Sequence, residues 1–75
     1  MQLLTTQEVG RLIAATRKRR GLTQADLANA IGASRFWVIR AEGGERVDLG
    51  FTLRALRVLG ISLRADVPAN EGPNG

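Results

Sequence analysis

The chain has 75 residues, a formal net charge of +4, and neither cysteine nor histidine. This length predicts one small domain and excludes a catalytic cleft with a separate substrate domain. The missing cysteines and histidines exclude disulfides, thiolate chemistry and ordinary zinc sites, so we expect no cofactor, no metal, no small-molecule substrate and no enzymatic activity. The positive charge favours an anionic partner such as nucleic acid, although small basic proteins are common.

Membrane and export signals are not evident in the sequence. No segment approaches the roughly 20 apolar residues of a membrane span. The first residues lack the basic region, apolar stretch and small-residue cleavage site of a secretory signal. We therefore expect no membrane partner and a cytoplasmic protein, associated with the bacterial nucleoid if it binds DNA.

A first helix is predicted from the residues that follow Thr5. Thr5 is a good N-cap, and Glu8 has the spacing of a capping box. Gly21 fits the left-handed position that ends such a helix. The stripe expected to face the core consists of Val9, Leu12, Ile13 and Thr16.

Four basic residues, 17–20, end this helix. Cations there complement the helix macrodipole, for which one or two would suffice. Four in succession point round most of the helix, so we predict that Lys18 and Arg19 contact phosphate.

Two short helical patterns then meet at Gly32, and Thr23 and Ser34 are suited to cap them. Helix, tight turn and helix is the form of a helix-turn-helix DNA reader. Gln24 follows the first cap, at a helix N-terminus where it is expected to donate a hydrogen bond to a DNA phosphate.

The second of these helices has distinct inward and outward sides. Val38 and Ala41 share one side and are expected to contact the core. The outward set expected to meet DNA is Ser34, Arg35, Phe36 and Arg40. Arginine is the commonest specific reader of guanine, and an aromatic edge packs on a thymine methyl. Trp37 lies on the flank, where core packing and DNA contact are equally open.

A connector and a last helix follow. Arg46 in the connector is a candidate phosphate contact, and Asp48 is the expected cap of the helix that Gly60 ends. The core stripe predicted for this helix is Leu49, Leu53, Leu56 and Leu59.

Beyond Gly60 the apolar period changes from 3.6 to 2, which predicts a strand over residues 61–67. Its apolar positions are Ile61, Leu63, Ala65 and Val67. A single strand needs a partner for its backbone groups, so we predict an antiparallel ribbon across the twofold axis of a homodimer. The alternative is a strand-like tail lying on the helices. The expected organisation is a DNA-binding domain over 1–60, a dimerisation strand over 61–67 and a flexible tail over 68–75.

The spacing RxxxGLTQxxLAxxxGxSxxxVxxxExG between Arg17 and Gly44 resembles that of Cro/repressor-type (XRE) helix-turn-helix regulators. The resemblance implies a mainly α, lambda-repressor-like domain of four to five helices that binds double-stranded operator DNA. It also implies an ion pair between Arg17 and Glu42, which makes Arg17 structural. The family usually has small polar residues where this chain has Phe36, Trp37 and Ile39, so its base contacts do not transfer to these positions.

The ending LGISLRADV, residues 59–67, is most similar to HipB-type antitoxins. That similarity implies a dimeric autorepressor of a type II toxin-antitoxin operon that also holds a HipA-type kinase toxin. Two alternatives stay open. One is a stand-alone XRE-family repressor, and the other is a protein-interaction module that docks through Phe36 and Trp37 and does not bind DNA.

Overall fold

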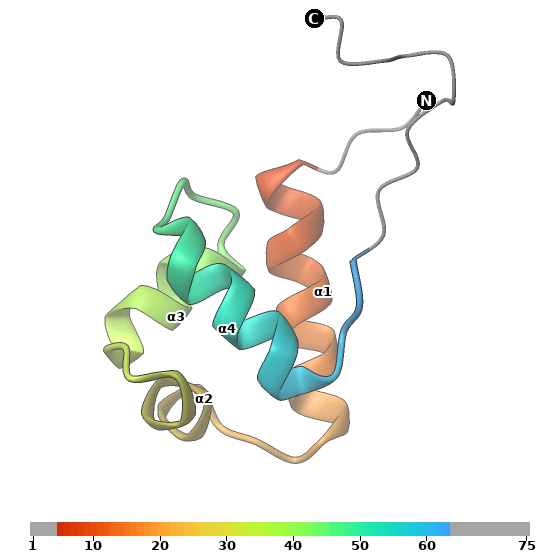
Figure 1. The fold of residues 1–75 in the computed structure, drawn as a ribbon, viewed down its shortest axis with the longest axis vertical. Helices are drawn as coiled ribbons and strands as arrows, with labels where there is room; N and C mark the ends of the chain where they lie inside the picture. Colours follow the sequence, from red (N-terminus) through yellow and green to blue (C-terminus); the bar gives the residue numbers. More distant parts are fainter. Residues whose placement is uncertain (1–4, 64–75) are drawn as a thin grey trace, which may run out of the picture.

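The computed structural model describes residues 5–63 as four helices (Figure 1). These are α1 (Thr6–Arg19), α2 (Gln24–Ile31), α3 (Arg35–Glu42) and α4 (Leu49–Leu59). Helices α1 and α2 each pack against both α3 and α4. Within this part of the chain, no helix has the length and hydropathy needed to cross a bilayer. The expected mainly α domain is confirmed, with four helices.

Each helix begins at the residue predicted to cap it. In every case a side-chain oxygen of the cap accepts a backbone N–H three residues later, at 3.0 Å. The four caps are Thr5, Thr23, Ser34 and Asp48. Capping of this kind satisfies a backbone donor that the first turn of a helix leaves unpaired. The helix boundaries therefore follow from local sequence.

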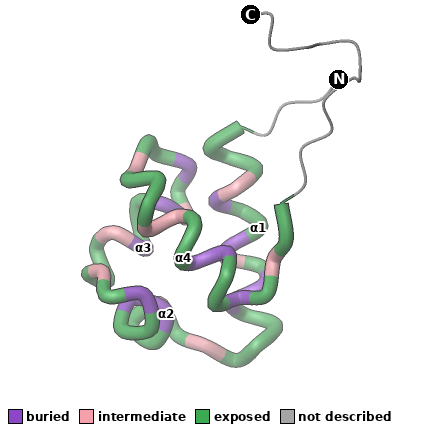
Figure 2. Tube along the Cα trace, in the orientation of Figure 1, coloured by how far each residue is buried: buried purple, intermediate pink, exposed green. Residues whose placement is uncertain are grey.

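The core lies where the four helices face one another (Figure 2). Val38 and Ala41, predicted to point inward from α3, are both buried. The other buried apolar residues are Ile13, Leu27, Ala28, Ile31, Ala55, Leu56 and Leu59. The nine core residues are all aliphatic: five are isoleucine or leucine, three are alanine and one is valine.

Three leucines predicted to lie in the core are exposed, so that part of the prediction was wrong. Leu12 is 37% exposed, Leu53 49% and Leu49 68%. On α1 the buried side runs through Gly10, Ile13 and Arg17, which rotates Leu12 towards solvent. The inward side of α4 is Thr52, Ala55, Leu56 and Leu59, so Leu49 and Leu53 fall on the adjacent flank.

Gly10 marks the place where α1 crosses α3. A Cβ built on Gly10 would lie 2.9 Å from the carbonyl oxygen of Glu42. That distance is shorter than a carbon and an oxygen tolerate without movement of one backbone. The close approach of the two helices therefore depends on the absence of a side chain at this position.

The segment after α4 has no strand over residues 61–63. Ile61 packs against the core, and its N–H donates to the carbonyl oxygen of Leu56 at 2.8 Å. No second strand is present in residues 5–63 to pair with this segment. The remaining predicted strand positions, Ala65 and Val67, and the tail 68–75 lie outside the described residues.

Candidate nucleic-acid interface

The outer face of α3 is an exposed surface of mixed aromatic, aliphatic and cationic side chains. It consists of Arg35, Phe36, Ile39 and Arg40, all of them exposed. Phe36 is 65% exposed and Ile39 40%. Val38 and Ala41, on the opposite side of the helix, are buried in the core. Their packing fixes the orientation of the outer face. Ser34, the remaining residue of the predicted outward set, is exposed and serves as the N-cap of the helix.

Arg40 on the outer face has two neighbours that fix its guanidinium. Its Nε donates to Oε1 of Glu45 at 3.0 Å. Its Cζ lies 5.7 Å from the centroid of the Phe36 ring, within the range of a cation–π contact. Two of the predicted DNA-contacting residues are thereby brought together. Glu45, in the connector after α3, was not among the residues predicted to belong to this site.

Trp37 points away from the outer face and towards α4. Its ring meets that of Phe51 edge-on, with centroids 5.6 Å apart and an interplanar angle of 63°. Its Nε1 is buried and has no hydrogen-bond partner within the described residues. Core packing and DNA contact were both left open for Trp37, and in the structure its side chain packs against the core. Its ring supports α3 from the α4 side.

A buried ion pair joins the ends of α1 and α3. Arg17 donates from Nε to Oε2 of Glu42 at 2.6 Å and from Nη2 to Oε1 at 3.1 Å. Both side chains are only 9% exposed. Arg17 also donates from Nη1 to the carbonyl oxygen of Leu22 at 2.8 Å, so it also holds the loop that leads into α2. The hydrogen bond to Glu42 raises the pKa of Arg17, while burial acts in the opposite direction.

Gln24 belongs to the same cluster. Its Nε2 donates to Oε1 of Glu42 at 3.2 Å, and the residue is half-buried. From the sequence, this amide was predicted to face a phosphate. The structure instead uses one of its N–H groups as a third donor to Glu42, leaving the second N–H for another acceptor. The start of α2 is thereby tied to the end of α3.

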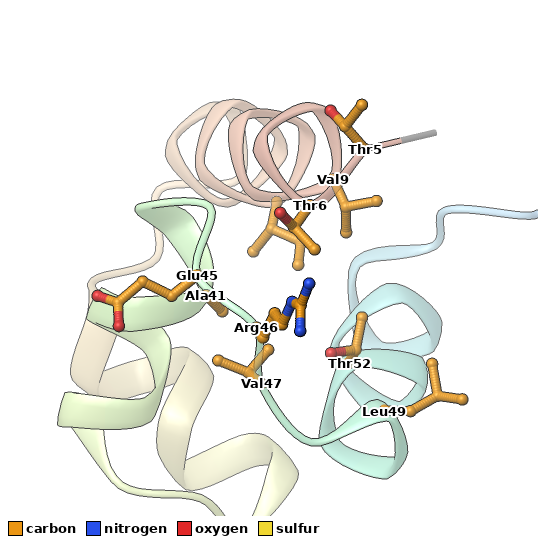
Figure 3. Close-up of a pocket in the computed structure, with 10 residues that line it drawn as sticks. Thr5, Thr6, Val9, Ala41, Glu45, Arg46, Val47, Leu49 and Thr52 are labelled. Atoms are coloured by element: carbon orange, nitrogen blue, oxygen red, sulfur yellow. The ribbon is translucent and has the colours of Figure 1, made fainter. Parts of the chain in front are cut away.

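The predicted phosphate contacts are spread over two elements. Lys18 and Arg19 are exposed in the last turn of α1, where Arg19 also donates to Oγ1 of Thr16 at 3.3 Å. Arg46 is exposed in the connector between α3 and α4. Its guanidinium points between Thr6 and Thr52, into a pocket of about 400 Å³ between α1 and α4 (Figure 3). Arg46 is therefore directed differently from Arg40.

A further arginine was missed by the sequence analysis. Arg54 of α4 donates to the carbonyl oxygen of Ile31 at 3.3 Å, at the end of α2. Its Cζ also lies 5.6 Å from the centroid of the Phe51 ring. A cation at a helix C-terminus is favourable, but the helix it serves here is not its own, which no local pattern predicts.

The acidic side chains between positions 5 and 63 serve as caps and ion-pair partners. Asp26 completes the capping box of α2, and its pKa is lowered by hydrogen bonds from the backbone and side chain of Thr23. No group of three acids suited to hold a metal occurs among these residues. Ser34 accepts the N–H of Trp37 as a cap. The chemistry on offer at the outer face is that of hydrogen-bond donors and apolar contact.

Comparison with known proteins gives one match. A family model described as a helix-turn-helix domain matches residues 8–69. No curated protein matches the chain. The matched span contains all of α2, α3 and α4 and most of α1.

Proposed function

Because this chain belongs to the helix-turn-helix domain family, we propose that it is a sequence-specific DNA-binding repressor that acts as a homodimer. The observation that carries the proposal is the outer face of α3. It combines two exposed arginines with an exposed phenylalanine on a helix whose other side is buried. The major groove admits an α-helix, and arginine and aromatic side chains suit guanine and the thymine methyl.

The dimer is part of the proposal for two reasons. A helix-turn-helix dimer sets its two reading helices about 34 Å apart, so that they enter successive major grooves of a palindromic site. Apolar surface near the end of the described chain is also available for a second copy, since Leu53 is 49% exposed and Leu63 50%. Leu63 is also the last described residue of the segment 61–67 that was predicted to pair across the dimer.

The test is a mobility-shift titration with the DNA upstream of the protein's own gene. Arg40→Ala should weaken binding to that DNA about tenfold or more, the range expected for loss of a bidentate arginine–guanine contact. Arg11→Ala is the matched control, because it removes the same charge from an exposed position of α1 outside the outer face of α3.

Two results would contradict the proposal. One is the absence of any retardation by the wild-type dimer at low salt. The other is an equal loss for the Arg40 and Arg11 variants, which would indicate binding through net charge alone. Sedimentation of the free protein tests the dimer separately.

A finer form of the proposal is that the chain is a HipB-type antitoxin that represses its own operon and neutralises a HipA-type kinase toxin. The ending LGISLRADV supports this form, because it is most similar to that group. The neighbouring gene discriminates between the possibilities. A kinase-like product that co-purifies with this chain supports the antitoxin, and its absence favours a stand-alone repressor.

The alternative of a protein-docking module is tested by the same variants. Under that alternative Arg40→Ala leaves partner binding intact and no DNA is bound. We propose no catalytic role and no cofactor, because Ser34 and the described acids already act as caps or ion-pair partners. A DNA-binding repressor of this kind acts in the cytoplasm, at the nucleoid.

A further inference from the structure

The geometry points to Glu45 as the residue that positions Arg40 for base readout, so that Phe36, Arg40 and Glu45 act as one unit. We infer that this unit reads a guanine next to a thymine in the major groove. The inference rests on the proposed function and adds to it the chemistry of the site and a positioning residue. It is carried by the placement of Glu45, the free end of the Arg40 guanidinium and the exposed ring of Phe36.

The backbone at the end of α3 fixes the position of Glu45. The N–H of Glu45 donates to the carbonyl oxygen of Arg40 at 3.1 Å, and the N–H of Gly44 donates to that of Ala41 at 3.1 Å. This reversal needs the left-handed conformation of Gly44, whose φ is 84°. Glu45 is therefore bonded twice to Arg40, once through its backbone and once through its carboxylate.

The carboxylate occupies one particular part of the guanidinium. Nε of Arg40 donates to Glu45, whereas neither Nη atom donates to another of residues 5–63. A planar guanidinium held at Nε presents its two Nη groups at the opposite end. A pair of parallel N–H donors there matches the O6 and N7 acceptors of guanine.

Phe36 completes the unit from the side. One face of its ring lies beside the Arg40 guanidinium, and the residue is 65% exposed. The part of the ring that Arg40 leaves uncovered is apolar and suits the methyl group of a thymine next to the guanine. Ile39, 40% exposed on the same outer face, extends the apolar surface.

Glu45 also disfavours binding that is independent of sequence. Its side chain is 56% exposed beside an arginine that is 44% exposed, so a phosphate approaching Arg40 also meets a carboxylate. Guanine presents neutral acceptors, so the carboxylate repels it less than it repels a phosphate. Loss of Glu45 should consequently raise affinity for unrelated DNA and lower the preference for the correct site.

The experiment begins with selection of binding sites from randomised duplexes by the wild-type protein. Affinity is then measured for the selected site, for each single-base variant, for sites with 7-deazaguanine in place of each guanine, and for an unrelated duplex. The proteins compared are the wild type, Glu45→Ala, Glu45→Gln, Arg40→Lys and Glu71→Gln. The last variant makes the same charge change as Glu45→Gln at a position outside the described residues.

The wild type should lose about tenfold or more at one guanine per half-site when N7 is removed, and a neighbouring thymine should be preferred. In Glu45→Ala this loss should shrink at least about threefold at that guanine only, while affinity for the unrelated duplex rises. Arg40→Lys should abolish the discrimination there, because lysine has no planar fork. Glu45→Gln should lie between the wild type and Glu45→Ala, and Glu71→Gln should match the wild type.

Two results overturn the role of Glu45 and leave the proposed function standing. One is a selected site at which Glu45→Ala discriminates every base as well as the wild type. The other is a loss spread evenly over all positions, which would indicate a general structural effect. If the wild type enriches no sequence at all, sequence-specific binding fails and this inference fails with it.

Discussion

Two arginine–glutamate ion pairs lie at the last turn of α3, and one is buried whereas the other is exposed. The pair between Arg17 and Glu42 is 9% exposed on both sides and ties α3 to α1. The pair between Arg40 and Glu45 is 44% and 56% exposed and ties the outer face of α3 to its own C-terminal turn. The inner pair has further partners, because the carbonyl oxygen of Leu22 accepts from Arg17 and Gln24 donates to Glu42. In the outer pair, neither Nη atom of Arg40 has a partner among residues 5–63.

Burial decides what each pair contributes. Breaking a buried pair leaves one charge without solvent and without a partner, which is costly. An exposed pair exchanges its partner for water at little cost, so it adds little to stability. We therefore expect the inner pair to maintain the fold and the outer pair to affect recognition. Four predictions test this division, from the largest expected effect to the smallest.

Arg17→Ala should produce the largest loss of stability. It removes three hydrogen bonds and leaves the buried Glu42 carboxylate with Gln24 as its one side-chain donor from residues 5–63. The expected fall in the free energy of unfolding is about 3–5 kcal/mol, measured by urea denaturation followed by circular dichroism. Arg17→Lys keeps the charge without the planar fork and should lose less. A change below about 1 kcal/mol, typical of exposed pairs, would show that the inner pair behaves like the outer one.

Gly10→Ala should come next, because it separates the helices that the inner pair joins. The added Cβ would lie 2.9 Å from the carbonyl oxygen of Glu42, so one backbone must move. We expect a net loss of about 1–3 kcal/mol, although alanine is the better helix former. Ala15→Gly, at an exposed position of the same helix, measures the propensity effect alone. Stabilisation by Gly10→Ala would rule out the close approach.

Gly44→Ala should disturb the turn that positions the outer pair. The φ of 84° at Gly44 costs a residue with a side chain about 1–2 kcal/mol. Its Cβ would also lie 2.9 Å from Cγ of Gln7. Gly43→Ala is the adjacent control, because Gly43 has a φ of −79° and its Cβ would make only ordinary contacts of 3.4 and 3.5 Å. In thermal melts, Gly44→Ala should have the lower melting temperature of the two variants. Equal melting temperatures would contradict the requirement for a left-handed backbone at residue 44.

The smallest effect is expected for the coupling between Arg40 and Glu45. A double-mutant cycle at this pair should give about 0–1 kcal/mol at low salt. The value should fall towards zero at about 1 M salt, where the Debye length is about 3 Å. The same cycle at the pair between Arg17 and Glu42 should be larger and should persist at high salt. Equal salt dependence of the two cycles would contradict the difference in burial.

The features that could be predicted from the sequence are local ones. Thr5, Thr23, Ser34 and Asp48 were identified as caps because a cap acts within three residues of itself. The inward positions Val38 and Ala41 followed from helical spacing on a short helix. The pair between Arg17 and Glu42 was expected from the family resemblance alone, since no spacing rule links residues 25 apart.

The features that could not be predicted depend on how one element meets another. Leu49 and Leu53 have core spacing, but the rotation of α4 about its axis is set by its partners, and the small Ala55 faces them instead. Gly10 reads as a weak point of a helix until the crossing with α3 is known. Glu45 follows two glycines and reads as connector. Its bond to Arg40 depends on the conformation of Gly44, which composition suggests but does not specify.

Because the side chain of Trp37 points towards α4, its fluorescence is an intrinsic probe of the structure. Trp37 is the single tryptophan of a chain without tyrosine, so its fluorescence has one source. The indole N–H is buried and has no partner among residues 5–63, and the ring packs edge-on against Phe51 of α4. We expect emission at short wavelength in the folded protein and a shift to the red in urea. This shift would report on the packing between α3 and α4. Since Phe36 and Trp37 point to different sides of α3, a change in emission on adding DNA would mean that α3 has moved against α4.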